Sequence, residues 1–159
     1  MTIRLLNNRF VLPVMCLLCT SCSGLNDYSA FSNVDSDGWK YGQSFLYRPS
    51  VTDSVADGTL RVAVVHTNDY PYRNLWLEVA YQVEAPDSTV TFRADTVNMQ
   101  LADAYGNWLG TGQGNTYQKV DTVCTDFHLI SGSPVRLRHI MRAESVEGLD
   151  KVGIIFEKK

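Results

Sequence analysis

Three histidines, His66, His128 and His139, are the side chains of this 159-residue chain best suited to hold a metal ion. With a carboxylate such as Asp126 they would supply the four ligands that a zinc ion takes. They fall on separate expected strands or strand edges, and their spacing gives no sign that they converge. The favoured interpretation is that each lies in or beside a core, so we expect no metal and no other cofactor.

Cys124 and His128 are the residues closest to a nucleophile–base pair. Residues four apart on a strand share a face but lie roughly 13 Å apart, too far for direct contact. No Gly-x-Ser-x-Gly motif occurs, and a glycosidase carboxylate pair is defined only by its separation in space. We therefore expect no catalytic residues and no enzyme, with a cleft of converging polar groups as the finding that would reverse this expectation.

Residues 106–114 form a glycine-rich segment, Gly-Asn-Trp-Leu-Gly-Thr-Gly-Gln-Gly. A phosphate-binding loop would need a strand before it, a helix after it and the right spacing of its glycines, and neither a dinucleotide fingerprint nor a P-loop is present. The glycines are better explained by a tight turn or bulge that lets Trp108 fold over a neighbouring strand.

Aromatic side chains gather around two expected turns: Tyr70, Tyr72 and Trp76 near the first, Tyr105 and Trp108 near the second. Exposed aromatic rings at loop ends stack on sugars or dock partner proteins. The alternative is that Trp76 and Trp108 pack at the edge of the core. Tyr70, Tyr72, Trp76 and Trp108 are thus the candidate interaction surface.

Alternation of apolar and polar residues predicts the strands that must position these side chains. The alternation puts His139 and Arg142 on opposite faces of one strand, and we expect Arg142 to pair with a carboxylate beneath a loop. Short strands separated by Gly/Pro-rich turns indicate an all-β fold, an antiparallel β-sandwich of jelly-roll type. The expected strands lie at 60–66, 75–84, 97–102, 135–142 and 152–156, with turns at 48–50, 56–58, 68–71, 85–88, 105–107 and 131–134 and one helical turn over 143–149.

Residues 1–21 have the three parts of a secretory signal peptide: positive charge, a short apolar run and small residues before Cys22. The apolar run is about 10 residues long, whereas a helix that spans a bilayer takes ~20. The segment resembles the lipobox of bacterial lipoproteins, in which a small residue precedes the lipidated cysteine; the alternative is an ordinary signal with Cys22 incidental. We expect residues 22–38 to form a flexible tether and 39–159 the sandwich domain.

Charge and cysteine content exclude several classes of protein. Removing Arg4 and Arg9 with the leader leaves 12 of the 14 Lys and Arg residues against all 17 Asp and Glu, a formal net charge of −5. A mildly acidic chain without a basic run is a poor nucleic-acid binder. Cys124 is the one cysteine beyond the leader region, so a disulfide framework is excluded.

Four blocks in order resemble the GldH family of gliding-motility-associated lipoproteins of Bacteroidetes. They are residues 70–77 (Tyr-Pro-Tyr-Arg-Asn-Leu-Trp-Leu), 103–112 (Asp-Ala-Tyr-Gly-Asn-Trp-Leu-Gly-Thr-Gly), 139–142 (His-Ile-Met-Arg) and 149–153 (Leu-Asp-Lys-Val-Gly). The resemblance implies a cell-envelope lipoprotein with an all-β domain and no enzyme or cofactor. We expect a membrane-anchored partner of other envelope proteins in gliding-motility or related machinery, facing the periplasm because no acidic cluster follows Cys22. The alternative function is a glycan-binding jelly roll.

Overall fold

The computed structural model describes residues 28–84 and 89–159. Within these ranges the secondary structure consists of strands alone, so no helix there is long and apolar enough to cross a membrane. The strands are β1 (Tyr28–Asn33), β2 (Trp39–Lys40), β3 (Phe45–Tyr47), β4 (Val55–Thr67), β5 (Asn74–Glu84), β6 (Val90–Gln100), β7 (Thr111–Gln113), β8 (Thr116–Ile130), β9 (Val135–His139), β10 (Ser145–Val146) and β11 (Leu149–Lys158).

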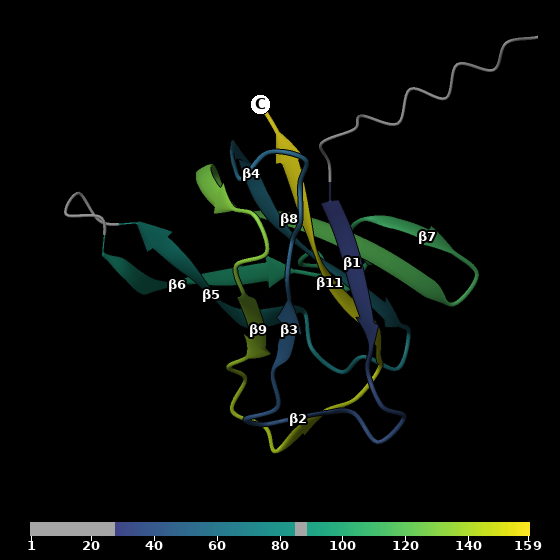
Figure 1. The fold of residues 1–159 in the computed structure, drawn as a ribbon. Coiled ribbons are helices and arrows are strands. Elements are labelled where there is room, and N and C mark those ends of the chain that lie inside the picture. Colours follow the sequence, from purple (N-terminus) through teal and green to yellow (C-terminus); the bar gives the residue numbers. More distant parts are fainter. Residues whose placement is uncertain (1–27, 85–88) are drawn as a thin grey trace, which may run out of the picture.

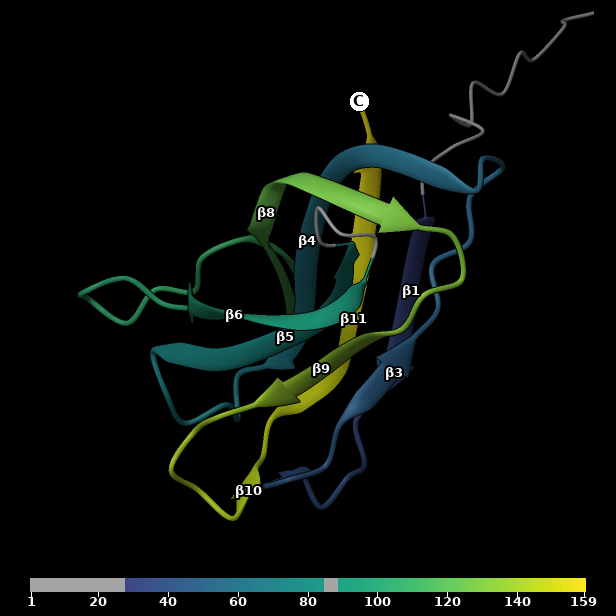
Figure 2. The ribbon, with the colours of Figure 1, turned by 60° about the vertical axis from the view of Figure 1, so that its left-hand side comes forward.

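Two antiparallel sheets pack into a sandwich (Figures 1 and 2). One sheet has five strands in the order β1-β11-β4-β8-β7, the other four in the order β3-β9-β5-β6, and β2 pairs with β10 separately. Without the short β2, β7 and β10, the remaining strands counted along the chain have the orders 1-8-3-6 and 2-7-4-5. That arrangement is a jelly roll, which confirms the predicted fold class.

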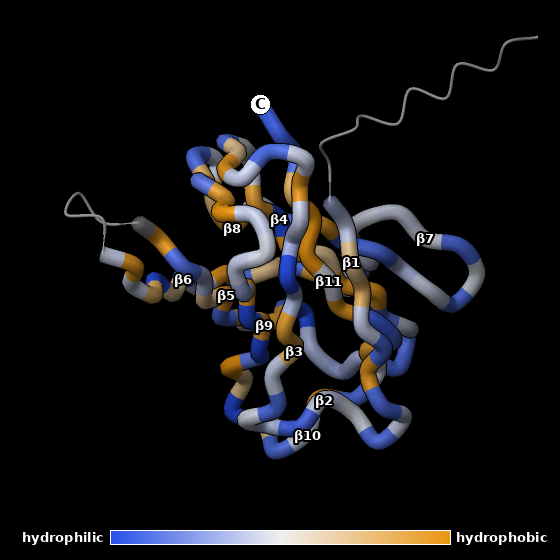
Figure 3. Tube along the Cα trace, in the orientation of Figure 1, coloured by the Kyte–Doolittle hydropathy of each residue, from blue (hydrophilic) through white to orange (hydrophobic). Residues whose placement is uncertain are grey.

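The core follows from the period of two that a strand imposes on its side chains. On β5, Leu75, Leu77 and Val79 are fully buried, while Trp76 and Glu78 between them point outward. The inward-facing residues of β4 and β11 form the opposite wall of the core. Figure 3 shows hydrophobic colouring along β11, between β1 and β4. Complete burial of such a side chain contributes about 1.5–3 kcal/mol each.

The predicted turn at 56–58 and helical turn at 143–149 are both wrong. Residues 56–58 lie inside β4, where Gly58 is required because a Cβ atom would meet the Phe156 ring at 2.6 Å. Residues 143–149 contain β10 and the start of β11 instead of a helix. Gly148 still ends a turn, with φ +75°, a conformation that L-residues rarely adopt.

The first strand lies within the segment expected to be a tether. β1 pairs with β11 from Tyr28 opposite Phe156 to Asn33 opposite Lys151, so the sandwich begins at residue 28 instead of 39. The ring of Phe31 lies over Gly153, where no side chain stands in its way. The leader, Cys22 and the remainder of the tether before residue 28 lie outside the described residues.

Four connecting segments meet at one end of the sandwich, which we call the connector end: residues 34–44, 68–73, 101–110 and 140–148. Backbone hydrogen bonds join them in pairs, from Tyr41 N–H to the Glu144 carbonyl at 2.7 Å and from Leu101 N–H to the Arg73 carbonyl at 2.8 Å. Leu149 pairs with His66 at the connector end, whereas the start of β1 pairs with the last residues of β11 at the opposite end of the sandwich. In Figure 1 this opposite end is at the top, next to the C-terminus.

Candidate functional site

Tyr70 and Trp108 pack at the connector end around His66. The Trp108 ring lies 4.6 Å from the His66 ring, and its Nε1–H donates to Asn68 Oδ1 at 2.8 Å. Tyr70 is buried, and its hydroxyl donates to the Asn74 carbonyl at 2.8 Å. Both aromatic residues therefore hold connecting segments together, as the core-edge interpretation predicted for Trp108.

Tyr72 and Trp76 are the two candidate aromatics with substantial exposure, 39% and 41%. Tyr72 stands edge-on to Tyr70 at 5.8 Å, beside the connector end. Trp76 instead points out from β5, on the outer face of the four-stranded sheet. The four predicted residues thus do not form one surface, and Trp76 alone of the four lies on the outer face of the four-stranded sheet.

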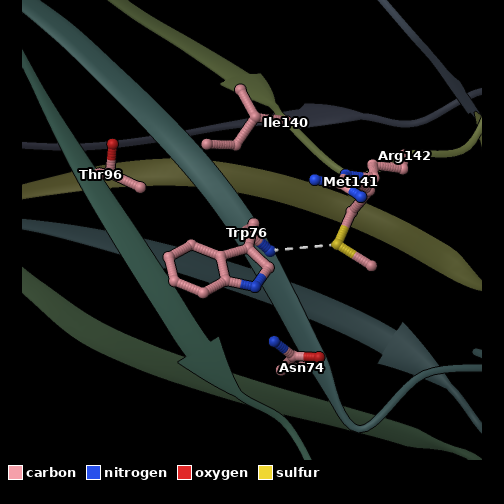
Figure 4. Close-up of a pocket in the computed structure, with 6 residues that line it drawn as sticks. All are labelled: Asn74, Trp76, Thr96, Ile140, Met141 and Arg142. Carbon is pink, nitrogen blue, oxygen red and sulfur yellow. Dashed lines mark hydrogen bonds between the residues drawn. The ribbon is translucent and has the colours of Figure 1, made fainter.

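A depression around Trp76, the Trp76 hollow, encloses about 560 Å³. Figure 4 shows the indole ring between Thr96 of β6 and the segment after β9. The backbone N–H of Trp76 donates to Met141 Sδ at 3.3 Å, which ties that segment to β5. Arg142 also lines the hollow; it is exposed and forms no ion pair, so the carboxylate partner expected for it is absent from the described residues.

A second depression, the Phe92 hollow, lies farther along the same face. It is lined by Leu46, Arg48, Phe92, Pro134 and Arg136. Phe92 is 65% and Leu46 57% exposed, unusually high values for apolar side chains on a sheet. Sequence reasoning missed this hollow, although extending the alternation of β6 from Val97 would have placed Phe92 on the outer face.

A single ion pair, Glu78 with Arg138, separates the two hollows. The two residues face each other across β5 and β9. Trp76 lies two residues before Glu78 along β5, on the side of the first hollow, and the Ala80–Arg136 cross-strand pair lies on the side of the second. Arg138 Nε and Nη2 donate to the two carboxylate oxygens of Glu78, each at 2.7 Å. These hydrogen bonds lower the pKa of Glu78 and raise that of Arg138.

Unpaired positive charge concentrates on this sheet face. Three arginines around the hollows, Arg48, Arg136 and Arg142, form no ion pair with any described residue, while most other described cations do. The remaining described Lys or Arg residues without an ion pair are Arg73 and Lys151. An otherwise acidic chain therefore presents one locally basic face.

The histidines do not converge. His139 is buried against Trp39, with ring centroids 5.3 Å apart, and neither ring nitrogen has a hydrogen-bond partner among the residues described. His66 lies under Trp108, and its Nδ1–H donates to the Thr67 carbonyl at 3.0 Å. Burial lowers the pKa of both buried histidines. His128 pairs with Asp57 at the surface, and the described ranges hold no group of three side chains able to bind a metal.

The glycine-rich segment forms turns, as predicted. Gly106 and Gly110 lead into β7, and Gly114 lies in the turn between β7 and β8, all with positive φ. Trp108 forms an isolated bridge with Ala102, so the segment folds back on itself beside β6. The backbone thus carries the indole ring to His66.

Two comparisons with known proteins agree. The family model described as GldH lipoprotein matches residues 26–155, a range that includes β1 and most of β11. The gliding motility lipoprotein GldH of Flavobacterium johnsoniae is 25% identical over 161 residues, which cover 97% of this chain and 98% of that protein. The similarity therefore extends over the whole described sandwich.

Proposed function

The chain belongs to the GldH lipoprotein family, a family of membrane-anchored envelope proteins, and we propose that it acts there as a non-enzymatic, protein-binding component of gliding-motility or related machinery. The single observation that carries the binding role is the outer face of the four-stranded sheet. Trp76, Phe92 and Arg136 are exposed on it together. Tryptophan and arginine are the residue types that dominate binding energy at protein interfaces.

Anchoring occurs, on this proposal, through lipidated Cys22. Five residues lie between Cys22 and the start of β1 at Tyr28, and the six residue-to-residue steps span at most about 20 Å when extended. β1 begins at the end of the sandwich opposite the connector end. The anchored domain would stay close to its membrane, with the connector end directed away from it into the periplasm.

A glycan-binding role is the second candidate, and the Trp76 hollow is the observation that favours it. Its exposed indole ring lies beside the amide of Asn74 and the guanidinium of Arg142. An apolar ring face flanked by hydrogen-bond donors suits a sugar ring. A glycan array probed with the soluble domain and with Trp76→Ala tests this role, because a sugar-dependent signal should disappear in the variant.

Labelling and crosslinking of the full chain in its native envelope test the leading function. Cys22→Ala should abolish palmitate labelling and membrane partition, whereas the control Cys124→Ala should retain both. Crosslinking followed by pull-down should recover specific envelope proteins with the wild-type chain. Continued labelling of Cys22→Ala would contradict the anchor, and the absence of any crosslinked envelope protein would contradict the binding role.

A further inference from the structure

We propose that the outer face of the four-stranded sheet, here called the docking face, binds an extended acidic segment of a partner protein through two subsites, the Trp76 hollow and the Phe92 hollow. The inference rests on the protein-binding function proposed above and adds the surface and the charge of the partner.

Each subsite combines an exposed aromatic ring with an arginine that has no ion pair in the part of the chain that the structure describes. Trp76 lies with Arg142 in one hollow, and Phe92 lies with Arg136 in the other. A guanidinium group binds a carboxylate through two parallel hydrogen bonds, which adds geometric specificity to charge attraction. The aromatic ring supplies apolar area at a small cost in side-chain entropy. Each subsite therefore fits an acidic residue next to an apolar one.

The Glu78–Arg138 pair sets the spacing of the two subsites. Because Arg138 donates through Nε and Nη2 to the carboxylate of Glu78, its charge is already paired, and the middle of the docking face offers no unpaired cation among the described residues. Gln82 pairs with Phe92, so the subsites lie six residues apart along β5. At ~3.3 Å per residue this is about 20 Å, the reach of an extended segment of about six residues. The partner should carry acidic residues toward the two ends of such a segment.

Charge complementarity favours an acidic protein over other occupants. A chain with more Asp and Glu than Lys and Arg repels acidic partners over most of its surface. The three unpaired arginines on one face therefore direct an acidic partner to that face. A neutral glycan would accept hydrogen bonds from these arginines but would make no use of their charge. The apolar lining of Leu46, Pro134 and Met141 suits side chains better than the headgroups of an anionic membrane.

Binding of poly-L-glutamate to the full-length protein in detergent tests the proposal. Arg136→Gln combined with Arg142→Gln should weaken binding about tenfold or more, and Trp76→Ala and Phe92→Ala should each weaken it as well. The matched control is Arg61→Gln with Lys151→Gln, which removes the same charge from the five-stranded sheet and should leave the affinity within about twofold. Thermal unfolding of each variant verifies that it is folded.

Equal weakening by the control pair would overturn the proposal, as would stronger binding to phosphatidylglycerol vesicles or to a neutral glycan array than to poly-L-glutamate. Crosslinking in the native envelope separates this proposal from the general function. If the Arg136/Arg142 double variant recovers the same envelope proteins as the wild type, the docking face is wrong and the binding function stands. If the wild type recovers none, the binding function itself is wrong.

Discussion

Glu78 and Arg138 face each other on adjacent strands of the four-stranded sheet and share two hydrogen bonds of 2.7 Å. Glu78 is the less exposed partner, with 20% of its side chain accessible against 37% for Arg138. The pair holds β5 to β9 on the outer side of the sheet, where no core packing contributes. It also divides the docking face into two hollows.

Glu78→Gln should destabilise the fold by about 1 kcal/mol, because a bidentate charged pair loses one ionised partner. A double-mutant cycle with Arg138→Gln, followed by urea unfolding, should give a coupling energy of about 0.5–1 kcal/mol. A coupling energy near zero would show that water screens the pair completely.

The same Glu78→Gln substitution should strengthen binding of poly-L-glutamate, although it weakens the fold. It removes a negative charge from the docking face and frees the Arg138 guanidinium for a ligand carboxylate. Glu157→Gln is the control, since Glu157 pairs with Arg61 on the other sheet. Titration calorimetry should show a gain of several-fold for Glu78→Gln and little change for Glu157→Gln. A gain of equal size in both variants would indicate a response to net charge alone.

Gly148→Ala should be strongly destabilising because two penalties add. Its φ of +75° disfavours any L-residue, and a Cβ atom would stand 2.4 Å from the backbone nitrogen of Tyr70. We expect a loss of about 2–4 kcal/mol. Gly42→Ala carries only the first penalty, since nothing lies within 4 Å of the added Cβ, and should lose about 1 kcal/mol. Chemical denaturation compares the two, and equal losses would contradict the close contact at Tyr70.

Stability should fall as the pH drops below about 6.5, the ordinary pKa of histidine. Burial lowers the pKa of His66 and His139 in the folded state, although the hydrogen bond to the Thr67 carbonyl and the charge of Asp150 oppose the shift in the pKa of His66. The unfolded chain then binds more protons than the folded chain over this range, so protonation favours unfolding. Carboxylates such as Glu78, whose pKa is lowered from 4.5, add their own loss only at more acidic pH.

Urea unfolding at pH 7.5 and pH 5.5 measures this dependence. His139→Phe should reduce the difference between the two values, because it removes one of the two buried imidazoles. The control His128→Gln alters an exposed histidine paired with Asp57 and should leave most of the difference in place. A pH difference that persists in full in His139→Phe would contradict the role of His139.

Alternation along the chain was sufficient to predict the sandwich and the sides of its strands. Leu77 points inward and Trp76 outward, as the period of two requires. β1 was missed because its apolar residues do not alternate with its polar ones: Phe31 points outward, whereas Ser32 is on the half-buried face. β8 was missed because its burial does not alternate cleanly and its pairing with β4 shifts register near Leu60.

The candidate site was less accessible to sequence reasoning. Tyr70 and Trp108 both pack against His66. The position of His66 depends on the pairing of β4 with β11, which the local spacing of residues does not reveal. Arg136 and Phe92 meet across three strands, a proximity that exists only after the sheet has formed. The two-residue alternation of a strand was nevertheless enough to place Arg136 and Phe92 on the outer face of the sheet.

Site-specific photocrosslinking in living cells tests the protein-binding account most directly. A benzophenone amino acid replaces Phe92 on the docking face or, as the control, Phe31, an exposed phenylalanine on the outer face of the five-stranded sheet. The account predicts a discrete crosslink from position 92 to an acidic segment of an envelope protein, lost in the Arg136/Arg142 double variant and absent from position 31. Identical products from both positions, or none from position 92, would contradict it.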